Sequence, residues 1–186
     1  MINATDIRKG MVVKVDEELF LIVDYEHIAP GNWRAIVQAK MRNIKQGNIV
    51  QRRFRSSDKL ESVFLESKVM EYLYKQGDTY CFMDTESYEQ VMLPADLVDP
   101  SMPYVALNSQ VRIGFYDGKP LSIDLPTSVV LKIVETDPGS RGNSVTNVFK
   151  PAKLETGLVV KVPLFINIGD KVKVDTRSGE FIARDN

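Results

Sequence analysis

Ala29-Pro30-Gly31-Asn32-Trp33-Arg34 joins two segments that both carry the pattern of β-strands. Residues 19–25 contain a short apolar run of the length that a buried strand needs, and residues 35–42 mostly alternate between apolar and polar side chains. Pro30-Gly31 is typical of a turn, because proline fixes φ at the first central position and glycine accepts a positive φ at the second. These features predict a β-hairpin whose connecting loop is extended by Asn32, Trp33 and Arg34.

The predicted hairpin carries an excess of positive charge. Residues 27–57 contain no Asp or Glu. The cations in this span are Arg34, Lys40, Arg42, Lys45, Arg52, Arg53 and Arg55. An acid-free basic span suits phosphate binding, because each phosphate that is neutralised releases condensed counterions. A solvated hairpin with an ordinary basic face explains the same residues, so the charge by itself leaves both interpretations open.

The composition is that of a globular protein rich in β structure. Of 186 residues, 44% are hydrophobic and 26% are charged, and Val, Ile, Tyr, Phe and Thr are frequent. An apolar run of about 18 residues and a basic-then-apolar N-terminal leader are both missing, so we expect neither a membrane span nor secretion. The single cysteine, Cys81, excludes a disulfide framework and fits a reducing, cytoplasmic compartment.

Turn signals and charge divide the chain into three segments, residues 1–64, 65–126 and 127–186. Short strands at regular spacing in each segment predict a small β-barrel or sandwich. The first segment has 11 Lys and Arg against 8 Asp and Glu, the second has 4 against 10, and the third has 9 against 7. This basic–acidic–basic order predicts that the two ends contact phosphate and that the middle segment faces something else.

Local patterns predict several further elements. In the second segment, Gly77-Asp78 and Asp117-Gly118 each predict a hairpin turn. One short helical turn is expected between Glu86 and Pro103, and the polar residues 56–59 suit the cap of another. In the third segment, strands are expected at residues 129–134, 159–166 and 171–175.

Residues for common catalytic and metal chemistry are missing. His27 is the only histidine, so a histidine-based triad and a multi-histidine metal site are excluded. No cysteine pair or glycine-rich phosphate loop is present. We therefore expect no enzymatic activity, no catalytic residue, no metal site and no cofactor.

The third segment resembles the signature of the elongation factor P family. The matching residues are Lys150-Pro151-Ala152, Gly157, Val160, Val162-Pro163, Ile166 and Gly169. Residues 171–180, Thr136-Asp137-Pro138-Gly139 and Pro30-Gly31 extend the resemblance over essentially the whole chain. It implies an all-β protein of three barrels arranged in an L, with an SH3/KOW-like first barrel followed by two OB-fold barrels.

The resemblance also implies a function in translation. Members of this family bind the ribosome between the peptidyl and exit sites and relieve stalling at consecutive prolines. By resemblance, the tip loop Pro30, Gly31, Asn32, Trp33 and Arg34 contacts the CCA end of peptidyl-tRNA and acts by positioning, with no covalent role. The cations expected to contact the RNA backbone are Lys40, Arg42, Lys45, Arg52, Arg53 and Arg55.

Two sites depart from the family pattern. Where known members carry a modified lysine or arginine after Pro-Gly, this chain has Asn32, so lysine-type modification is not available and arginine-type modification requires Arg34. Asn32 and Arg34 are the candidate modification sites. We favour an unmodified tip in which Arg34 supplies charge and Trp33 stacks on a base or stiffens the loop. The alternative is that Trp33 packs back onto the barrel.

The second departure is in the loop of the third segment that is expected to contact mRNA. Gly142-Asn143-Ser144 replaces the usual Gly-Asp-Thr and loses one negative charge. The expected partners are therefore the ribosome, peptidyl-tRNA and mRNA in the exit site, with no membrane, for a monomeric protein. Two alternatives stay open: a related factor with a different set of stalled sequences, and a general OB-fold RNA-binding protein.

Overall fold

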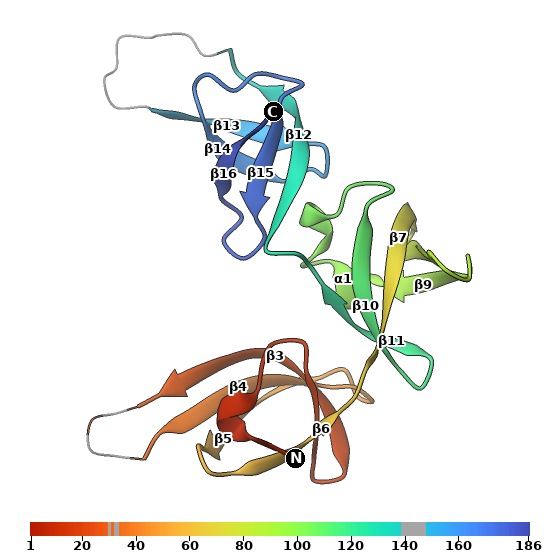
Figure 1. Cartoon of the computed structure of the whole chain (residues 1–186), viewed down its shortest axis with the longest axis vertical. Helices are drawn as coiled ribbons and strands as arrows, with labels where there is room; N and C mark the ends of the chain where they lie inside the picture. Colours follow the sequence, from red (N-terminus) through yellow and green to blue (C-terminus); the bar gives the residue numbers. More distant parts are fainter. Residues whose placement is uncertain (30, 32–33, 139–147) are drawn as a thin grey trace. The chain divides into compact units, whose positions relative to one another are not determined.

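The computed structural model describes residues 1–29, 31, 34–138 and 148–186, and it confirms the predicted all-β fold. The strands form one six-stranded and two five-stranded sheets, which follow one another along the chain (Figure 1). By its internal contacts the chain divides into two compact units, residues 1–68 with 113–122, and residues 69–112 with 123–186. The segment boundaries at 64 and 126 stay a prediction.

The first sheet contains the predicted hairpin. Its strand order is β1-β6-β2-β3-β4-β5. The strands are β1 (Ile2–Asn3), β2 (Val12–Val15), β3 (Glu18–Ile28), β4 (Ile36–Asn43), β5 (Ile49–Arg55) and β6 (Lys59–Val63). Alternate apolar side chains of β2 to β5 meet in one core with Ala4 and Ile7, both fully buried. Because β3 and β4 are long, the hairpin extends to the edge of this core, where the tip loop begins.

The second sheet has the order β11-β10-β7-β8-β9. Its strands are β7 (Glu66–Gln76), β8 (Thr79–Asp84), β9 (Gln90–Pro94), β10 (Gln110–Tyr116) and β11 (Lys119–Asp124). Two short helices, α1 (Ala95–Val98) and η2 (Met102–Tyr104), lie between β9 and β10 in the chain. Both predicted hairpins are confirmed, since β7 pairs with β8 and the Asp117-Gly118 turn connects β10 to β11. Both turn residues have positive φ, 49° and 76°, as the Asp-Gly pair predicts.

The third sheet has the order β14-β13-β12-β15-β16. Its strands are β12 (Ser128–Thr136), β13 (Phe149–Leu154), β14 (Val159–Pro163), β15 (Lys171–Asp175) and β16 (Phe181–Asp185). Buried side chains from four of them, β12 to β15, form a compact core that Ile166 completes. Strands β12 to β15 contain alternating buried and exposed positions, whereas the last strand, β16, is mostly exposed.

Several local predictions are wrong. Residues 56–58 form only a turn, and the chain then enters β6, which pairs with β1 and β2. The segment from Glu86 to Pro103 holds the unpredicted strand β9 and begins a second helical turn, η2, besides α1. The expected strand 159–166 ends at Pro163, and β13 and β16 were not predicted. Pro151 made β13 hard to predict, because proline lacks the N–H that a residue of a central strand normally donates.

Candidate RNA-binding surface

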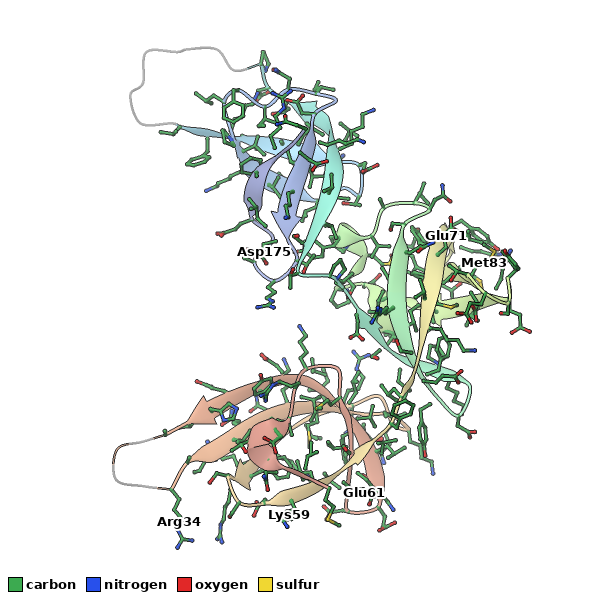
Figure 2. All side chains as sticks on the ribbon, in the orientation of Figure 1. Arg34, Lys59, Glu61, Glu71, Met83 and Asp175 are labelled. Atoms are coloured by element: carbon green, nitrogen blue, oxygen red, sulfur yellow. The ribbon has the colours of Figure 1, made fainter. Side chains whose placement is uncertain are left out.

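The tip loop is presented by a continuous strand pair. Ile28 of β3 lies opposite Ile36 of β4, which leaves residues 29–35 as the connection. Gly31 has φ of +45°, a conformation that favours glycine, and a Cβ there would meet no atom within 4 Å. Arg34 is exposed, and Figure 2 shows its side chain pointing away from the hairpin. Pro30, Asn32 and Trp33, the other predicted tip residues, lie outside the described residues.

Four of the predicted RNA-contacting cations share one face of the hairpin sheet. Directly opposite residues of paired strands point to the same face, and Val37, Ala39 and Met41 of β4 point into the core. The intervening positions of β4 and their partners on β5 therefore form the outer face. Its cations are Lys40, Arg42, Arg53 and Arg55. Arg53 is further oriented by donating from Nε to Gln38 Oε1 at 3.3 Å.

The other two predicted cations lie elsewhere. Arg52 is opposite Ala39 and therefore on the other face, where its guanidinium is 2.6 Å from Asp16 Oδ2 and 5.8 Å from the centroid of the Phe20 ring. Lys45 lies in the turn between β4 and β5, at the opposite end of β4 from the tip. The Asn43 carboxamide builds this turn by accepting hydrogen bonds from the backbone N–H groups of Lys45 and Gln46, both at 2.9 Å.

The outer face also contains acidic side chains that the linear charge pattern did not reveal. Asp24 lies opposite Lys40, and Glu26 lies opposite Gln38 in the β3–β4 pairing. Four cations and two carboxylates give this face a formal charge of +2. The face still attracts phosphate, but less strongly than an acid-free span would, because each carboxylate offsets one cation.

In the third barrel, the predicted mRNA-contacting residues Gly142, Asn143 and Ser144 lie outside the described residues. The two strands that carry this loop are joined at its base. Lys150 Nζ donates to the Asp137 carbonyl oxygen at 2.6 Å, and Thr136 Oγ1 donates to the Pro151 carbonyl oxygen at 2.9 Å. Lys150 is only 6% exposed, so it joins β13 to the residue after β12 rather than presenting an exposed cation. Sequence reasoning missed this role, because a lysine normally predicts a solvated charge.

Comparison with known proteins identifies the chain. Three family models match consecutive parts of it: "Elongation factor P (EF-P) KOW-like domain" at residues 3–60, "Elongation factor P (EF-P) OB domain" at 65–123, and "Elongation factor P, C-terminal" at 129–184. The elongation factor P of Nitratidesulfovibrio vulgaris is 48% identical over 185 residues, covering 100% of both chains. The chain belongs to the elongation factor P family.

A second curated relative agrees with this assignment. The elongation factor P of Caldanaerobacter subterraneus is 47% identical over 184 residues, covering 99% of this chain and 100% of the relative. A solved structure, eukaryotic translation initiation factor 5A from Methanococcus jannaschii, is 20% identical, covers 66% of this chain and 92% of its own, and has a TM-score of 0.42. Membership of the elongation factor P family makes the chain a translation elongation factor rather than a member of a conventional enzyme family.

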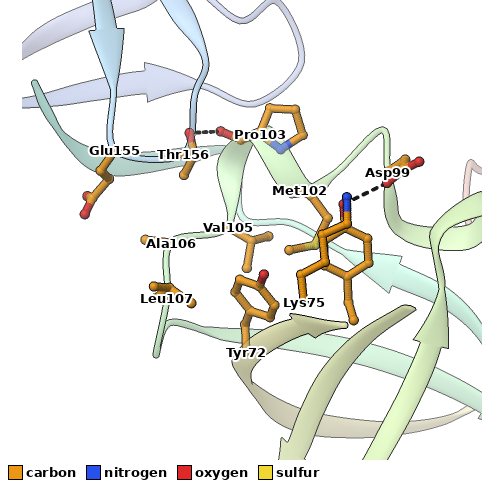
Figure 3. Close-up of a pocket in the computed structure, with 11 residues that line it drawn as sticks. Tyr72, Lys75, Asp99, Met102, Pro103, Val105, Ala106, Leu107, Glu155 and Thr156 are labelled. Carbon is orange, nitrogen blue, oxygen red and sulfur yellow. Dashed lines mark hydrogen bonds between the residues drawn. The ribbon is translucent and has the colours of Figure 1, made fainter. Parts of the chain in front are cut away.

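A cleft of about 600 Å³ lies within the second compact unit of this elongation factor P family member (Figure 3). Met102, Val105 and Tyr72 contribute apolar surface to its walls. The Tyr80 hydroxyl donates to Asp99 Oδ1 at 2.9 Å, and Thr156 Oγ1 donates to the Pro103 carbonyl oxygen at 2.6 Å. Burial raises the pKa of Tyr72 above its ordinary value. Its lining carries one cation, Lys75, against two carboxylates, Asp99 and Glu155, so the cleft does not favour phosphate.

Other kinds of site were sought in the same residues. Among the described residues, no three His, Cys, Asp or Glu side chains gather as a metal ion would require. Within that same part of the chain, no helix is long and apolar enough to cross a membrane. Cys81 is buried and its thiol lies 3.6 Å from Gln90 Oε1. The surface best suited to recognition is therefore the hairpin with its cationic outer face and Arg34.

Proposed function

We propose that this protein binds the ribosome beside peptidyl-tRNA and accelerates peptide-bond formation when the reacting residues are consecutive prolines. Membership of the elongation factor P family supports a role in elongation. The observation that carries the finer proposal is the hairpin: cations of β4 and β5 share one face of its sheet, and Arg34 lies in the loop that connects β3 to β4. In this proposal the cationic face binds the tRNA backbone, and the tip reaches the CCA end.

The contribution to the reaction is positional. Proline is a poor nucleophile in this setting, because its ring fixes φ and restricts the approach of its secondary amine. Holding the acceptor end of peptidyl-tRNA in attack geometry converts a badly aligned encounter into an oriented one. A protein side chain does not need to react in this scheme, so no catalytic residue, metal or cofactor is invoked.

The tip is proposed to act unmodified. Asn32 occupies the position where family members carry a modified residue, so Arg34 is the permanent cation nearest that position. Trp33 would stack on a base or stiffen the loop. Gly142, Asn143 and Ser144 are proposed to contact mRNA in the exit site. The protein would act as a monomer in the cytoplasm, where the ribosomes are.

The direct test is a proline–proline peptide-bond assay on reconstituted ribosomes. Arg34→Ala is expected to lower the stimulated rate by about tenfold, because it removes the tip cation from a geometry-dependent step. Lys59→Ala is the matched control, since Lys59 is an exposed lysine of β6 and is not among the cations expected to contact RNA. If Arg34→Ala stimulates as well as the unchanged protein, Arg34 has no role at the tip. Intact-mass measurement on protein from the native host decides whether Arg34 or Asn32 is modified.

A related factor with a different set of stalled sequences is the second candidate, and Asn32 at the tip is the observation that favours it. Ribosome profiling of a strain lacking the protein separates the two. Pauses at consecutive prolines support the first candidate, and pauses at other motifs support the second. Without sequence-specific pausing, a general RNA-binding role would replace both.

A further inference from the structure

A chain of side chains connects the start of the protein to the hairpin that presents the tip. The Arg8 guanidinium carbon lies 5.9 Å from the centroid of the Tyr25 ring, and Tyr25 meets His27 edge-to-face at 5.6 Å with an interplanar angle of 85°. Both are preferred geometries, for a cation over an aromatic face and for an aromatic pair. His27 lies opposite Val37 of β4 and is separated from Ala29, where the loop begins, by Ile28 alone.

The hairpin needs support at this point. The β3–β4 pairing shifts register between Ile22 and Asp24, and such a bulge bends the strand locally. Beyond the bulge, the β3 side chains on the core-facing side are Tyr25 and His27, whereas Phe20 and Ile22 before it are buried. β5 continues the sheet beside β4 as far as Ile36, but β3 is an edge strand beyond the bulge, because its pairing with β2 ends at Leu21. The side-chain contacts of Tyr25 therefore help to set the direction of the hairpin end.

Arg8 is exposed, but hydrogen bonds to the backbone just before it hold its guanidinium in place. One terminal nitrogen of its guanidinium, Nη1, donates to the carbonyl oxygens of Ile7 at 2.7 Å and Thr5 at 3.1 Å. The short helix that precedes it, η1 (Ala4–Asp6), is held by Ala4 N–H donating to the Asp58 carbonyl oxygen at 2.8 Å. Ile7 is fully buried in the core of the first barrel. Arg8 thus links the backbone beside the buried Ile7 to the Tyr25 ring.

We infer that Arg8, Tyr25 and His27 form a brace that fixes the direction of the hairpin end, so that Arg8 and Tyr25 are positioning residues for the tip loop. This inference rests on the proposed function. A tip that acts by orientation loses much of its effect when its mean position shifts by about 1 Å, even if every contacting residue is intact. Binding of the whole protein to the ribosome depends on the larger cationic surface and is preserved.

The experiment compares two pairs of variants. Arg8→Gln removes the charge and keeps a long side chain, and Lys9→Gln is its control because Lys9 is exposed and has no part in the brace. Tyr25→Leu removes the ring, and Tyr25→Phe keeps it. Because Tyr25 also packs against the barrel core, Arg8→Gln provides the readout that leaves the core unchanged.

Two measurements are made on each variant. The first is the maximal stimulated rate of proline–proline bond formation, together with the protein concentration that gives half of it. The second is the backbone order of Ala29 and Ala35 from amide relaxation, which reports on fast motion of the hairpin end. Arg8→Gln and Tyr25→Leu are expected to lower the maximal rate by about fivefold to tenfold, to change the half-saturating concentration by less than about twofold, and to lower the order. The control variants should match the unchanged protein.

Three results would overturn the brace: unchanged order in Arg8→Gln, an unchanged maximal rate, or a change in the half-saturating concentration alone, which would make these residues contacts. Equal losses in the control variants would overturn it as well. If the unchanged protein fails to stimulate the reaction, the proposed function fails, while the order measurement still tests the brace by itself.

Discussion

Arg52 and Arg53 are adjacent in sequence but lie on opposite faces of β5, which gives a matched pair of substitutions for testing the cationic face. Arg53→Ala removes a cation from the outer face. Arg52→Ala removes one that is already paired with Asp16 at 2.6 Å on the other face. If RNA binds the outer face, only the first substitution should change the electrostatic part of binding.

The magnitude follows from counterion release. Each phosphate contact adds about 0.7 to 0.9 to the slope of log affinity against log salt. Arg53→Ala removes one such contact and should therefore lower the slope by about 0.8. Between about 50 and 200 mM salt, the variant should lose roughly threefold less affinity than the unchanged protein does. Arg52→Ala should leave the slope unchanged. Its exposed ion pair is worth less than about 1 kcal/mol, so the fold should tolerate the loss.

The assay is a fluorescence titration of ribosomes carrying peptidyl-tRNA, at fixed magnesium and several KCl concentrations. A slope change in Arg53→Ala and none in Arg52→Ala is the expected result. Equal slope changes in both variants would show that the electrostatic contact does not distinguish the faces of β5. No change in either would mean that Arg53 does not meet phosphate, and the outer face would lose its assigned role.

Two further predictions concern stability. Lys150→Met should lower the free energy of unfolding by about 1 to 3 kcal/mol, because the substitution keeps the apolar stem but leaves the Asp137 carbonyl without its donor. Thermal unfolding measures this loss, with Lys153→Met at an exposed position as the control. An unchanged unfolding midpoint would contradict the anchoring role of Lys150. The pKa of Asp175 is lowered from 3.8 because its carboxylate accepts hydrogen bonds from the backbone N–H groups of Arg177 and Ser178. Its stabilising contribution is therefore complete above the unfolded pKa and is lost as the pH falls through the lower folded value. Asp175→Asn should weaken the dependence of the free energy of unfolding on pH below about 4. Denaturant titration at several pH values measures this dependence, with Asp185→Asn as the control. An unaltered pH profile would show that these hydrogen bonds do not favour the charged form of Asp175.

The sequence by itself determined the fold class and the main hairpins. A short apolar run predicted the strand before residues 29–34 and alternation at period two predicted the strand after them, while Asp117-Gly118 specified its turn, because these signals depend only on neighbouring residues. The family signature around Lys150-Pro151-Ala152 likewise needs only spacing along the chain. Strands without a local signal were missed: Pro151 concealed β13, and the exposed, weakly apolar β16 exists because it pairs with β15.

The tertiary structure decided which charges belong to the candidate site. Seven cations between residues 34 and 55 look alike in the sequence. Strand pairing nevertheless puts Arg52 beside Asp16, Lys45 at the far turn, and Asp24 and Glu26 on the cationic face. Lys150 changes from an apparent loop cation to a buried anchor only when β12 and β13 come together. The physical reason is that electrostatic and hydrogen-bond partners are set by distance in space, and residues many positions apart become neighbours only through pairing and packing.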